Sequence, residues 1–359
     1  MPDSMGRLRL GVIFGGRSGE HEVSVVSARH VMEAADKERF EVVPIGISKR
    51  GAWLTPKETQ AQLKRGEGAY EKTLELAEAE GLLARPAVLE VLSDVDVVFP
   101  LVHGVNGEDG TLQGLLELAR VPYVGAGVAA SAAGLDKALM KALFLQAGLP
   151  GADYLVFVES RWYREPKAVV AEIEREIPYP CFVKPANGGS SVGITKVRSR
   201  ENLGEAIALA FRYDRKMLVE RAVEGREIEC ALLGNDDPQA SPLGEIVYSR
   251  EFYDYEAKYL DTSTQLFAPA DVEPETARRI QEMAVRAFRA IDCAGLARVD
   301  FFLRPDGKAV VDELNTLPGF TPISMYPRLW QVAGLSYSAL ISRLVELALE
   351  RFREKEKLA

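Results

Sequence analysis

The chain has 359 residues, of which 47% are hydrophobic and 27% charged, and this is the composition of a folded globular protein. Its length is sufficient for two or three domains with a sizeable core. The net charge of -9 argues against nucleic acid as a main partner, because no basic stripe is available to follow a phosphate backbone.

The cysteines and the N-terminal segment both favour a cytoplasmic protein. Cys181, Cys230 and Cys293 are odd in number and widely spaced, so we expect reduced thiols in the core. The first apolar run is short and is followed at once by Gly15 and Gly16. We therefore expect neither a signal peptide nor a membrane span.

The first third of the chain alternates strands and helices. Strands are predicted over residues 8–14, 40–48 and 96–102, and helices over residues 21–35 and 111–119. This alternation predicts an α/β domain with a doubly wound parallel sheet. The charged, Ala-rich stretch 55–89, with a weak helical period at 70–80, is interpreted as a peripheral excursion of this domain.

Two glycine-containing loops follow predicted strands of this domain. The first reads G-G-x-x-G from Gly15, and the dinucleotide fingerprint G-x-G-x-x-G cannot be placed on it, which argues against a dehydrogenase. Its glycines either let the backbone approach a small substrate or simply form a tight turn. The second loop, HGVNGEDG, lies where open α/β sheets bind ligands, or else Glu108 or Asp109 caps the next helix.

Gly- and Ala-rich sequence at 121–127 predicts a boundary to a β-rich middle unit. Its predicted helices are 136–147, 168–177 and 201–213, and its strands 154–159, 181–185, 192–197 and 217–221. The loop KPANGGSSVG places Lys184 at a strand end, where an ammonium can meet a phosphate, and its glycines and serines offer further donors. It lacks the Gly-Lys-Ser/Thr end of a Walker A loop, and it also suits a mobile surface turn.

The last part of the chain reads as a larger α+β unit. Its predicted elements are strands at 227–233 and 243–249, a long loop at 251–267, a helix of about five turns that begins at Pro274, and an amphipathic helix at 337–354. Glu220 and Glu227 flank Gly225 just before these elements. They could accept hydrogen bonds from an adenine amino group or ribose hydroxyls, or be ordinary surface charges.

A hairpin is predicted within RVDFFLRPDGKAVVDELNTLPGFT, residues 298–321, because two apolar-rich runs flank a Pro-Asp-Gly turn. Arg298, Asp300, Glu313 and Asn315 stand at the outer ends of these runs. Strand pairing would therefore bring one cation, two carboxylates and an amide oxygen together. Hard oxygen ligands of this kind suit Mg²⁺, whereas the alternative is a hairpin whose ends carry solvated charges.

These pieces together indicate a reaction class. A lysine and a Gly/Ser loop would contact phosphates, the hairpin oxygens would hold Mg²⁺, and Arg298 would stand beside them as a fixed cation. Such a site stabilises phosphoryl transfer by neutralising charge and by positioning. The sequence offers no Ser-His-Asp arrangement, reactive cysteine or redox motif as a competing interpretation.

The order of eight motifs closely resembles that of the D-alanine–D-alanine ligases, an ATP-grasp family. These motifs are GGRSGEHEVS, HGVNGEDG, VGAGVAAS…LDK, KPANGGSSVG, VERAVEGRE, EFYDYEAKY, ARVDFF and ELNTLPGFTPISMYP. The resemblance runs from residue 8 to about residue 348. It implies an α/β (α+β) ATP-grasp fold with a substrate-binding domain at 1–125, a central subdomain at 126–220 and a C-terminal subdomain at 221–359.

The resemblance also implies a reaction and its requirements. The family phosphorylates the carboxylate of a first D-alanine with ATP, and the amine of a second D-alanine displaces phosphate, which yields a peptidoglycan precursor. The implied cofactors are ATP and two Mg²⁺ ions, with Mn²⁺ possible in their place. A cytoplasmic homodimer that acts on small molecules, with no nucleic-acid or membrane partner, is the implied state.

Residue roles carry over by position in the motifs. The ATP-binding residues would be Lys137, Lys184, Ser191 and Lys258 at the phosphates, with Glu220 and Glu227 at adenine and ribose. The metal ligands would be Asp300, Glu313 and Asn315.

The remaining roles concern the two amino acids. Glu22 would hold the first D-alanine's ammonium with His103 nearby, Arg298 and the Gly319 N–H would form the oxyanion hole, and Ser324 and Met325 would hold the second D-alanine's carboxylate. Tyr259, Ser190 and Glu22 resemble a hydrogen-bonded trio that ties the loop to the other domains.

Two alternatives stay open at this point. The same fold could use D-lactate or another D-amino or hydroxy acid as second substrate, although the intact Glu-Ala-Lys-Tyr ending at Tyr259 favours an amine nucleophile. A non-catalytic nucleotide-binding protein would require a broken site, yet every expected acid, lysine and arginine is present.

Overall fold

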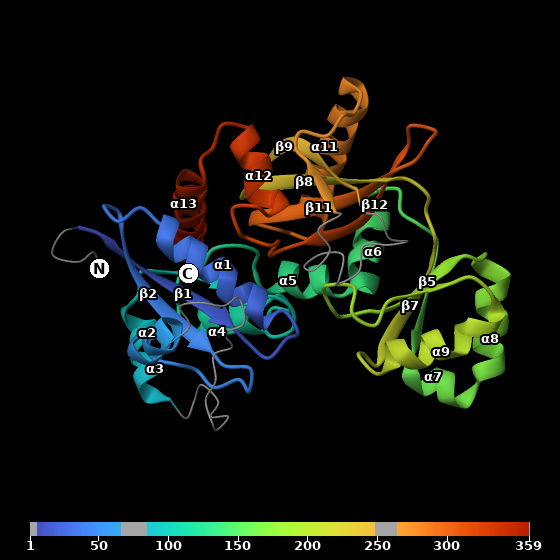
Figure 1. The fold of residues 1–359 in the computed structure, drawn as a ribbon, viewed down its shortest axis with the longest axis horizontal. Coiled ribbons are helices and arrows are strands. Elements are labelled where there is room, and N and C mark those ends of the chain that lie inside the picture. Colours follow the sequence, from blue (N-terminus) through green and yellow to red (C-terminus); the bar gives the residue numbers. More distant parts are fainter. Residues whose placement is uncertain (1–5, 66–84, 248–263, 359) are drawn as a thin grey trace.

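The computed structural model describes residues 6–65, 85–247 and 264–358, and these residues form three β-sheets covered by helices (Figure 1). The N-terminal sheet and the middle sheet lie at opposite ends of the molecule, and the C-terminal sheet lies between and above them in this view. The described residues therefore form the mixed α/β architecture expected from the sequence.

The first sheet is parallel, with the order β2-β1-β3. Its strands are β1 (Leu8–Gly15), β2 (Phe40–Ile47) and β3 (Val97–Leu101). One face packs against α1 (His21–Ala34) and the distant α13 (Tyr337–Glu356), and the other against α3 (Pro86–Asp94) and α4 (Thr111–Leu118). All three strands are buried, as a sheet covered on both faces requires. The doubly wound prediction is confirmed.

The stretch predicted as an excursion contributes two helices. The predicted helical period at 70–80 lies outside the described residues. On either side of it the chain forms α2 (Pro56–Arg65) and α3, of which α3 contributes Val88 and Leu92 to the core. The Thr59 hydroxyl, fully buried, accepts a hydrogen bond of 3.0 Å from the Gly46 N–H of β2.

The middle sheet is antiparallel, with the order β4-β7-β5-β6. Its strands are β4 (Tyr154–Val158), β5 (Cys181–Pro185), β6 (Thr195–Val197) and β7 (Lys216–Arg221), and its helices are α7 (Glu159–Arg164), α8 (Pro166–Glu176) and α9 (Arg200–Phe211). Strand β6 begins three residues later than predicted. Ser190 and Ser191 adopt left-handed φ angles of 50° and 57°, so the chain before β6 is a turn.

The C-terminal sheet is antiparallel, with the order β10-β9-β8-β11-β12. Its strands are β8 (Arg226–Gly234), β9 (Gln239–Val247), β10 (Gln265–Phe267), β11 (Gly295–Leu303) and β12 (Ala309–Asn315). Helix α11 (Pro274–Ala290) begins at the predicted proline, and α12 (Met325–Val332) was not predicted. Helices α5 (Val128–Leu135) and α6 (Lys137–Gln146) precede the middle sheet in sequence but share their core with this one.

The hairpin of β11 and β12 forms as predicted, and a β-bulge between Asp300 and Phe301 shifts its register by one residue. Arg298 pairs with Asn315, and Asp300 pairs with Glu313. Residues directly opposite each other share a face of the sheet, as do residues two apart on one strand. All four polar side chains therefore extend from one face at the end away from the turn.

Two further sequence expectations concern the cysteines and the membrane. Cys181, Cys230 and Cys293 are buried and unpaired, as predicted, and burial raises the pKa of Cys181 to about 11. No single helix within the described ranges is long and apolar enough to cross a membrane, and only α12 and α13 together, bent by 103°, reach that length and hydropathy.

Candidate active site

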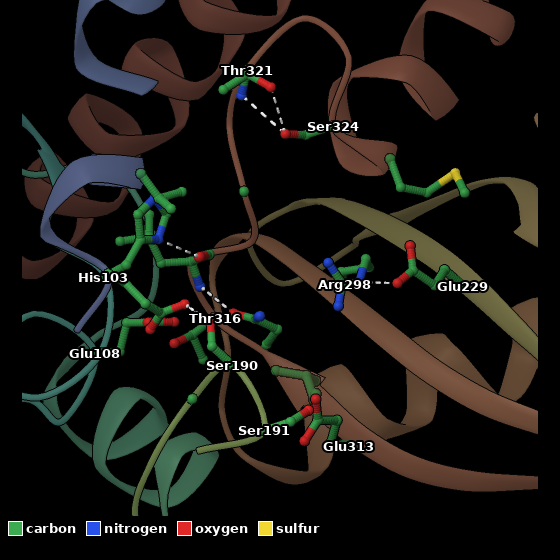
Figure 2. A pocket seen from close by; sticks show the side chains of 18 of the residues that line it. His103, Glu108, Ser190, Ser191, Glu229, Arg298, Glu313, Thr316, Thr321 and Ser324 are labelled. Atoms are coloured by element: carbon green, nitrogen blue, oxygen red, sulfur yellow. Dashed lines mark hydrogen bonds and ion pairs between the residues drawn. The ribbon is translucent and has the colours of Figure 1, made fainter. Parts of the chain in front are cut away.

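The predicted site residues converge on two adjoining cavities of about 830 Å³ and 120 Å³. Figure 2 shows residues of the first domain, the Gly/Ser loop and the C-terminal sheet approaching one another around the larger one. The two cavities share the side chains of Lys137, Ser191, Ile194, Glu229, Arg298 and Glu313. A ligand in one cavity would thus be next to a ligand in the other.

The larger cavity collects the residues predicted to hold amino acids, and the smaller one collects those predicted to hold ATP. Two predicted residues, Lys258 and Tyr259, lie outside the described residues. The larger cavity is lined by Glu22, His103, Lys137, Ser190, Ser191, Arg298, Glu313, Asn315, Gly319, Ser324 and Met325. The smaller is lined by Lys137, Lys184, Ser191, Glu220, Glu227, Arg298, Asp300 and Glu313. Every described residue of the predicted set therefore lines at least one of the two cavities.

Arg298 is fixed between two carboxylates at the boundary of the cavities. Its Nε and Nη2 each donate to an oxygen of Asp300 at 2.7 Å, and its Nε lies 3.0 Å from Glu229 Oε1 (Figure 2). Burial alone would lower the pKa of Arg298, but the two carboxylates outweigh this effect and raise it well above its ordinary value. The guanidinium is thus a permanent, oriented cation.

The hairpin end is chemically suited to Mg²⁺. Asp300 and Glu313 oppose each other across the strands, and Asn315 adds an amide oxygen on the same face. No three His, Cys, Asp or Glu side chains form a metal-binding group among the described residues. An ion here would therefore rely on two carboxylates, the amide and ligand oxygens, which is how Mg²⁺ is commonly held together with substrate phosphates.

Lys184 and Glu220 form a buried ion pair in the smaller cavity. Lys184 Nζ lies 2.6 Å from Glu220 Oε2, and the two side chains are 12% and 3% exposed. Burial would lower the pKa of Lys184, but Asp312 and Glu220 outweigh it and the pKa is raised. Each carboxylate oxygen has two lone pairs, so Glu220 can still accept a hydrogen bond from a ligand.

The Gly/Ser loop is tied at its base. The backbone N–H of Lys137 donates to the Ala186 carbonyl at 2.9 Å, and its Nζ donates to the Gly188 carbonyl at 2.8 Å. Asn187 donates twice to Asp214, through its backbone N–H and its side-chain amide, at 2.8 Å each. The loop thus presents its two serines to the cavities from a fixed base.

The tip of the loop meets Glu20 rather than Glu22. Ser190 Oγ donates to the Glu20 carboxylate, and a Cβ on Gly189 would approach that carboxylate to 2.8 Å. Glu22 forms an ion pair with Lys49 instead; burial would raise the pKa of Glu22, but Lys49 outweighs it and the pKa is lowered. The expected contact between Ser190 and Glu22 is therefore wrong. Glu20 precedes α1 in the turn, whereas Glu22 lies in its first turn.

The HGVNGEDG loop places Asp109 beside the start of α4 and Glu108 in the larger cavity. Asp109 accepts a hydrogen bond of 2.9 Å from the Thr111 N–H at the start of α4. Glu108 instead lines the larger cavity, and burial together with the nearby Glu20 carboxylate raises its pKa to about 8. His103 donates through Nδ1 to the Leu317 carbonyl at 3.2 Å, and burial lowers its pKa.

The far end of the larger cavity is the N-terminus of α12. Ser324 precedes the helix, and its Oγ accepts from the Thr321 N–H at 3.2 Å and bonds Thr321 Oγ1 at 2.8 Å (Figure 2). Met325 is the first residue of the helix and is buried. The first N–H groups of a helix have no intrahelical partners and attract anions. This end can therefore bind a carboxylate.

Comparisons with known proteins agree with this geometry. The family models described as "D-ala D-ala ligase N-terminus" and "D-ala D-ala ligase C-terminus" match residues 9–126 and 143–346. The D-alanine–D-alanine ligase of Geobacillus thermodenitrificans is 50% identical over 364 residues and covers 98% of both chains. That of Heliobacterium modesticaldum is 51% identical over 98% of this chain and 97% of its own. The chain belongs to the D-alanine–D-alanine ligase family.

Solved structures of this family have the same fold. The Coxiella burnetii D-alanine–D-alanine ligase matches with a TM-score of 0.80 and 34% identity, over 98% of this chain and 97% of its own. The Enterococcus faecalis VanG D-Ala:D-Ser ligase matches with a TM-score of 0.80 and 36% identity, over 95% and 99%. The ATP-grasp prediction is confirmed.

Sequence reasoning missed several residues that line the two cavities or form ion pairs with residues that line them. They are Glu20, Glu108, Lys141, Glu229 and Asp312. Glu20, Glu108 and Asp312 stand within two residues of predicted site residues or inside quoted motifs, so motif position was an available signal. Lys141 carried no such signal, because a lysine on an amphipathic helix normally belongs to its solvated face.

Proposed function

We propose that this chain joins two D-alanine molecules with ATP, through a D-alanyl phosphate, to form D-alanyl-D-alanine. The observation that supports the proposal most strongly is the shared wall of the two cavities. Arg298 and Glu313 line both, so a nucleotide γ-phosphate in one could meet an amino acid carboxylate in the other. Phosphoryl transfer depends mainly on such positioning and on charge neutralisation.

The nucleotide would occupy the smaller cavity. Lys137 and Lys184 would contact its phosphates, and Glu220 and Glu227 would accept hydrogen bonds from adenine and ribose. Asp300, Glu313 and Asn315 would hold two Mg²⁺ ions, which when bound would neutralise charge on the phosphates. Lys258 belongs to this proposed set by resemblance alone.

The two amino acids would occupy the larger cavity. The Glu20 carboxylate, beside the Gly/Ser loop, would hold the first ammonium, with Glu22 and His103 at the same wall. Arg298 and the Gly319 N–H would stabilise the oxyanion that forms when the second amine attacks the acyl phosphate. The N-terminus of α12 would hold the carboxylate of the second D-alanine.

The Gly/Ser loop would protect the intermediate. An acyl phosphate is hydrolysed by water, so the reaction requires a covered site. The contact of Ser190 with Glu20 joins the loop to the first domain. Its release would permit entry and product exit, as in other enzymes with mobile loops.

A substrate panel tests the proposal. Purified protein with ATP and Mg²⁺ should release phosphate only when D-alanine is added, and the dipeptide should accumulate in equal amount. D-Serine and D-lactate should be offered in competition as second substrates, because one structural relative is a D-Ala:D-Ser ligase. Preference for either over D-alanine at neutral pH would replace the proposed substrate while keeping the reaction class.

The cytoplasmic homodimer is part of the same proposal. It rests on the resemblance to the family. Sedimentation equilibrium of the purified protein measures it directly: a mass near 79 kDa, twice the 39.4 kDa of one chain, is expected, and a mass of 39.4 kDa would contradict it.

A further inference from the structure

Four charged side chains form a closed group at the wall of the smaller cavity, and two of them, Lys141 and Glu220, are buried. Lys141 of α6 and Lys184 of β5 alternate with Glu220 of β7 and Asp312 of β12. Lys141 Nζ lies 2.5 Å from Glu220 Oε1 and 3.4 Å from Asp312 Oδ1. Lys184 Nζ lies 2.6 Å from Glu220 Oε2 and 3.6 Å from Asp312 Oδ1. The group joins a helix and strands from both the middle and the C-terminal sheets.

The two lysines differ in what else they can reach. Lys184, Glu220 and Asp312 line the smaller cavity, whereas the described lining of both cavities does not include Lys141. Lys141 also donates to the Asp312 backbone carbonyl at 3.0 Å, so its three N–H groups have three protein partners. Lys141 can therefore affect a ligand only through its neighbours.

The charges of the group balance. Two ammonium groups compensate two carboxylates, and Lys141 and Glu220 are 6% and 3% exposed. An uncompensated charge at such a site is strongly unfavourable. If Lys184 turned toward a nucleotide phosphate without Lys141 present, Glu220 and Asp312 would lose all compensation from this group. Removing Lys141 should therefore hold Lys184 more tightly on the carboxylates and away from a ligand.

We propose that Lys141 is a positioning residue for the nucleotide: it fixes Glu220 and Asp312 and balances their charge, which leaves Lys184 able to bind a phosphate. The inference rests on the proposed function for the identity of the ligand. It adds that nucleotide binding requires equal positive and negative charge among Lys141, Lys184, Glu220 and Asp312, although Lys141 does not line the cavity.

Binding of ADP, measured by calorimetry without D-alanine, tests this inference apart from catalysis. Lys141→Met keeps much of the side-chain volume and removes the charge, and it should weaken ADP binding by about tenfold, the effect of roughly 1.4 kcal/mol. Asp312→Asn alone leaves a surplus cation and should tighten binding. The double variant restores the balance and should bind within about threefold of the unmodified protein. The variants should rank in the same order of ADP affinity when the measurement is made with Mg²⁺ and when it is made with EDTA.

Two controls separate charge balance from structural damage. Lys355→Met removes a lysine from an ion pair with Glu117 on the surface and should leave ADP binding unchanged. Lys141→Arg retains the charge and should bind ADP better than Lys141→Met. If Lys141→Met does not fold, ADP affinity is compared among Lys141→Arg, Asp312→Asn and the unmodified protein. Asp312→Asn should still bind ADP more tightly than the unmodified protein, and the absence of this tightening would overturn the inference.

The inference is overturned if Lys141→Met binds ADP within twofold of the unmodified protein. It is also overturned if Asp312→Asn fails to rescue that variant, because a packing defect would persist in the double variant. In steady state, Lys141→Met should raise KM for ATP far more than it lowers kcat. If the binding order holds while the unmodified protein shows no D-alanine-dependent phosphate release, the inference stands and the proposed function fails.

Discussion

The contact between Ser190 and Glu20 predicts a measurable coupling between the loop and the first domain. Ser190 is 8% exposed, and its hydroxyl donates to a carboxylate, so the bond is charge-assisted. Hydrogen bonds to charged groups contribute about 1.5–3 kcal/mol, and the partial exposure of Glu20 places this one near the lower end. A coupling of about 1.5 kcal/mol is roughly tenfold in kcat/KM for D-alanine.

A double-mutant cycle measures this coupling. Ser190→Ala, Glu20→Gln and the double variant should be compared by kcat/KM for D-alanine. The loss in the double variant should be smaller than the sum of the two single losses by about 1.5 kcal/mol. The matched control cycle uses Glu22→Gln, because Glu22 is paired with Lys49. That second cycle should be additive to within about 0.5 kcal/mol. Additivity in the first cycle, or equal coupling in both, would refute the assignment of the loop contact to Glu20.

Two further predictions concern the hairpin and the buried Glu108. Asp300→Asn should raise the Mg²⁺ concentration for half-maximal phosphate release by roughly tenfold or more, while the matched change Asp306→Asn at the turn should not; equal effects would contradict a metal role. Burial raises the pKa of Glu108 in the folded protein to about 8. The contribution of this carboxyl to folding stability is therefore full below its ordinary pKa and is lost as the pH rises toward 8. Relative to Glu108→Gln, the melting temperature should fall from pH 5 to 8, and a constant difference would contradict it.

Local patterns were sufficient to predict the fold of the first domain and the hairpin. The parallel strands are continuous apolar runs, and the Pro-Asp-Gly turn lies between two such runs. The register counted from that turn would oppose Asp300 to Asp312, and the β-bulge next to Asp300, which opposes it to Glu313 instead, could not be predicted from the pattern. The same locality explains the helix boundary at Pro274. These features depend on residues that are close in sequence.

Features that depend on distant partners could not be predicted in this way. Helices α5 and α6 have apolar faces, but a pattern does not say which sheet covers them, and they pack on β12 rather than on the sheet that follows them. Lys141 has an ordinary helical position, and only the fold brings Glu220 and Asp312 to it.

The choice between Glu20 and Glu22 shows a limit of motif reasoning. Two carboxylates lie two residues apart in GGRSGEHEVS, and the motif alone does not say which one faces the loop. The turn before α1 directs Glu20 toward Ser190, whereas Glu22 meets Lys49. The resemblance therefore indicated the motif that contacts the loop but not which of its two carboxylates makes the contact.

Transfer of oxygen from substrate to phosphate tests the central claim most directly. The account requires a D-alanine carboxylate oxygen to attack the γ-phosphorus and the second amine to displace that oxygen with the phosphate. D-Alanine labelled with ¹⁸O in its carboxylate should therefore yield one labelled oxygen in each inorganic phosphate released, together with one dipeptide. Unlabelled phosphate, or phosphate release independent of D-alanine, would contradict the account.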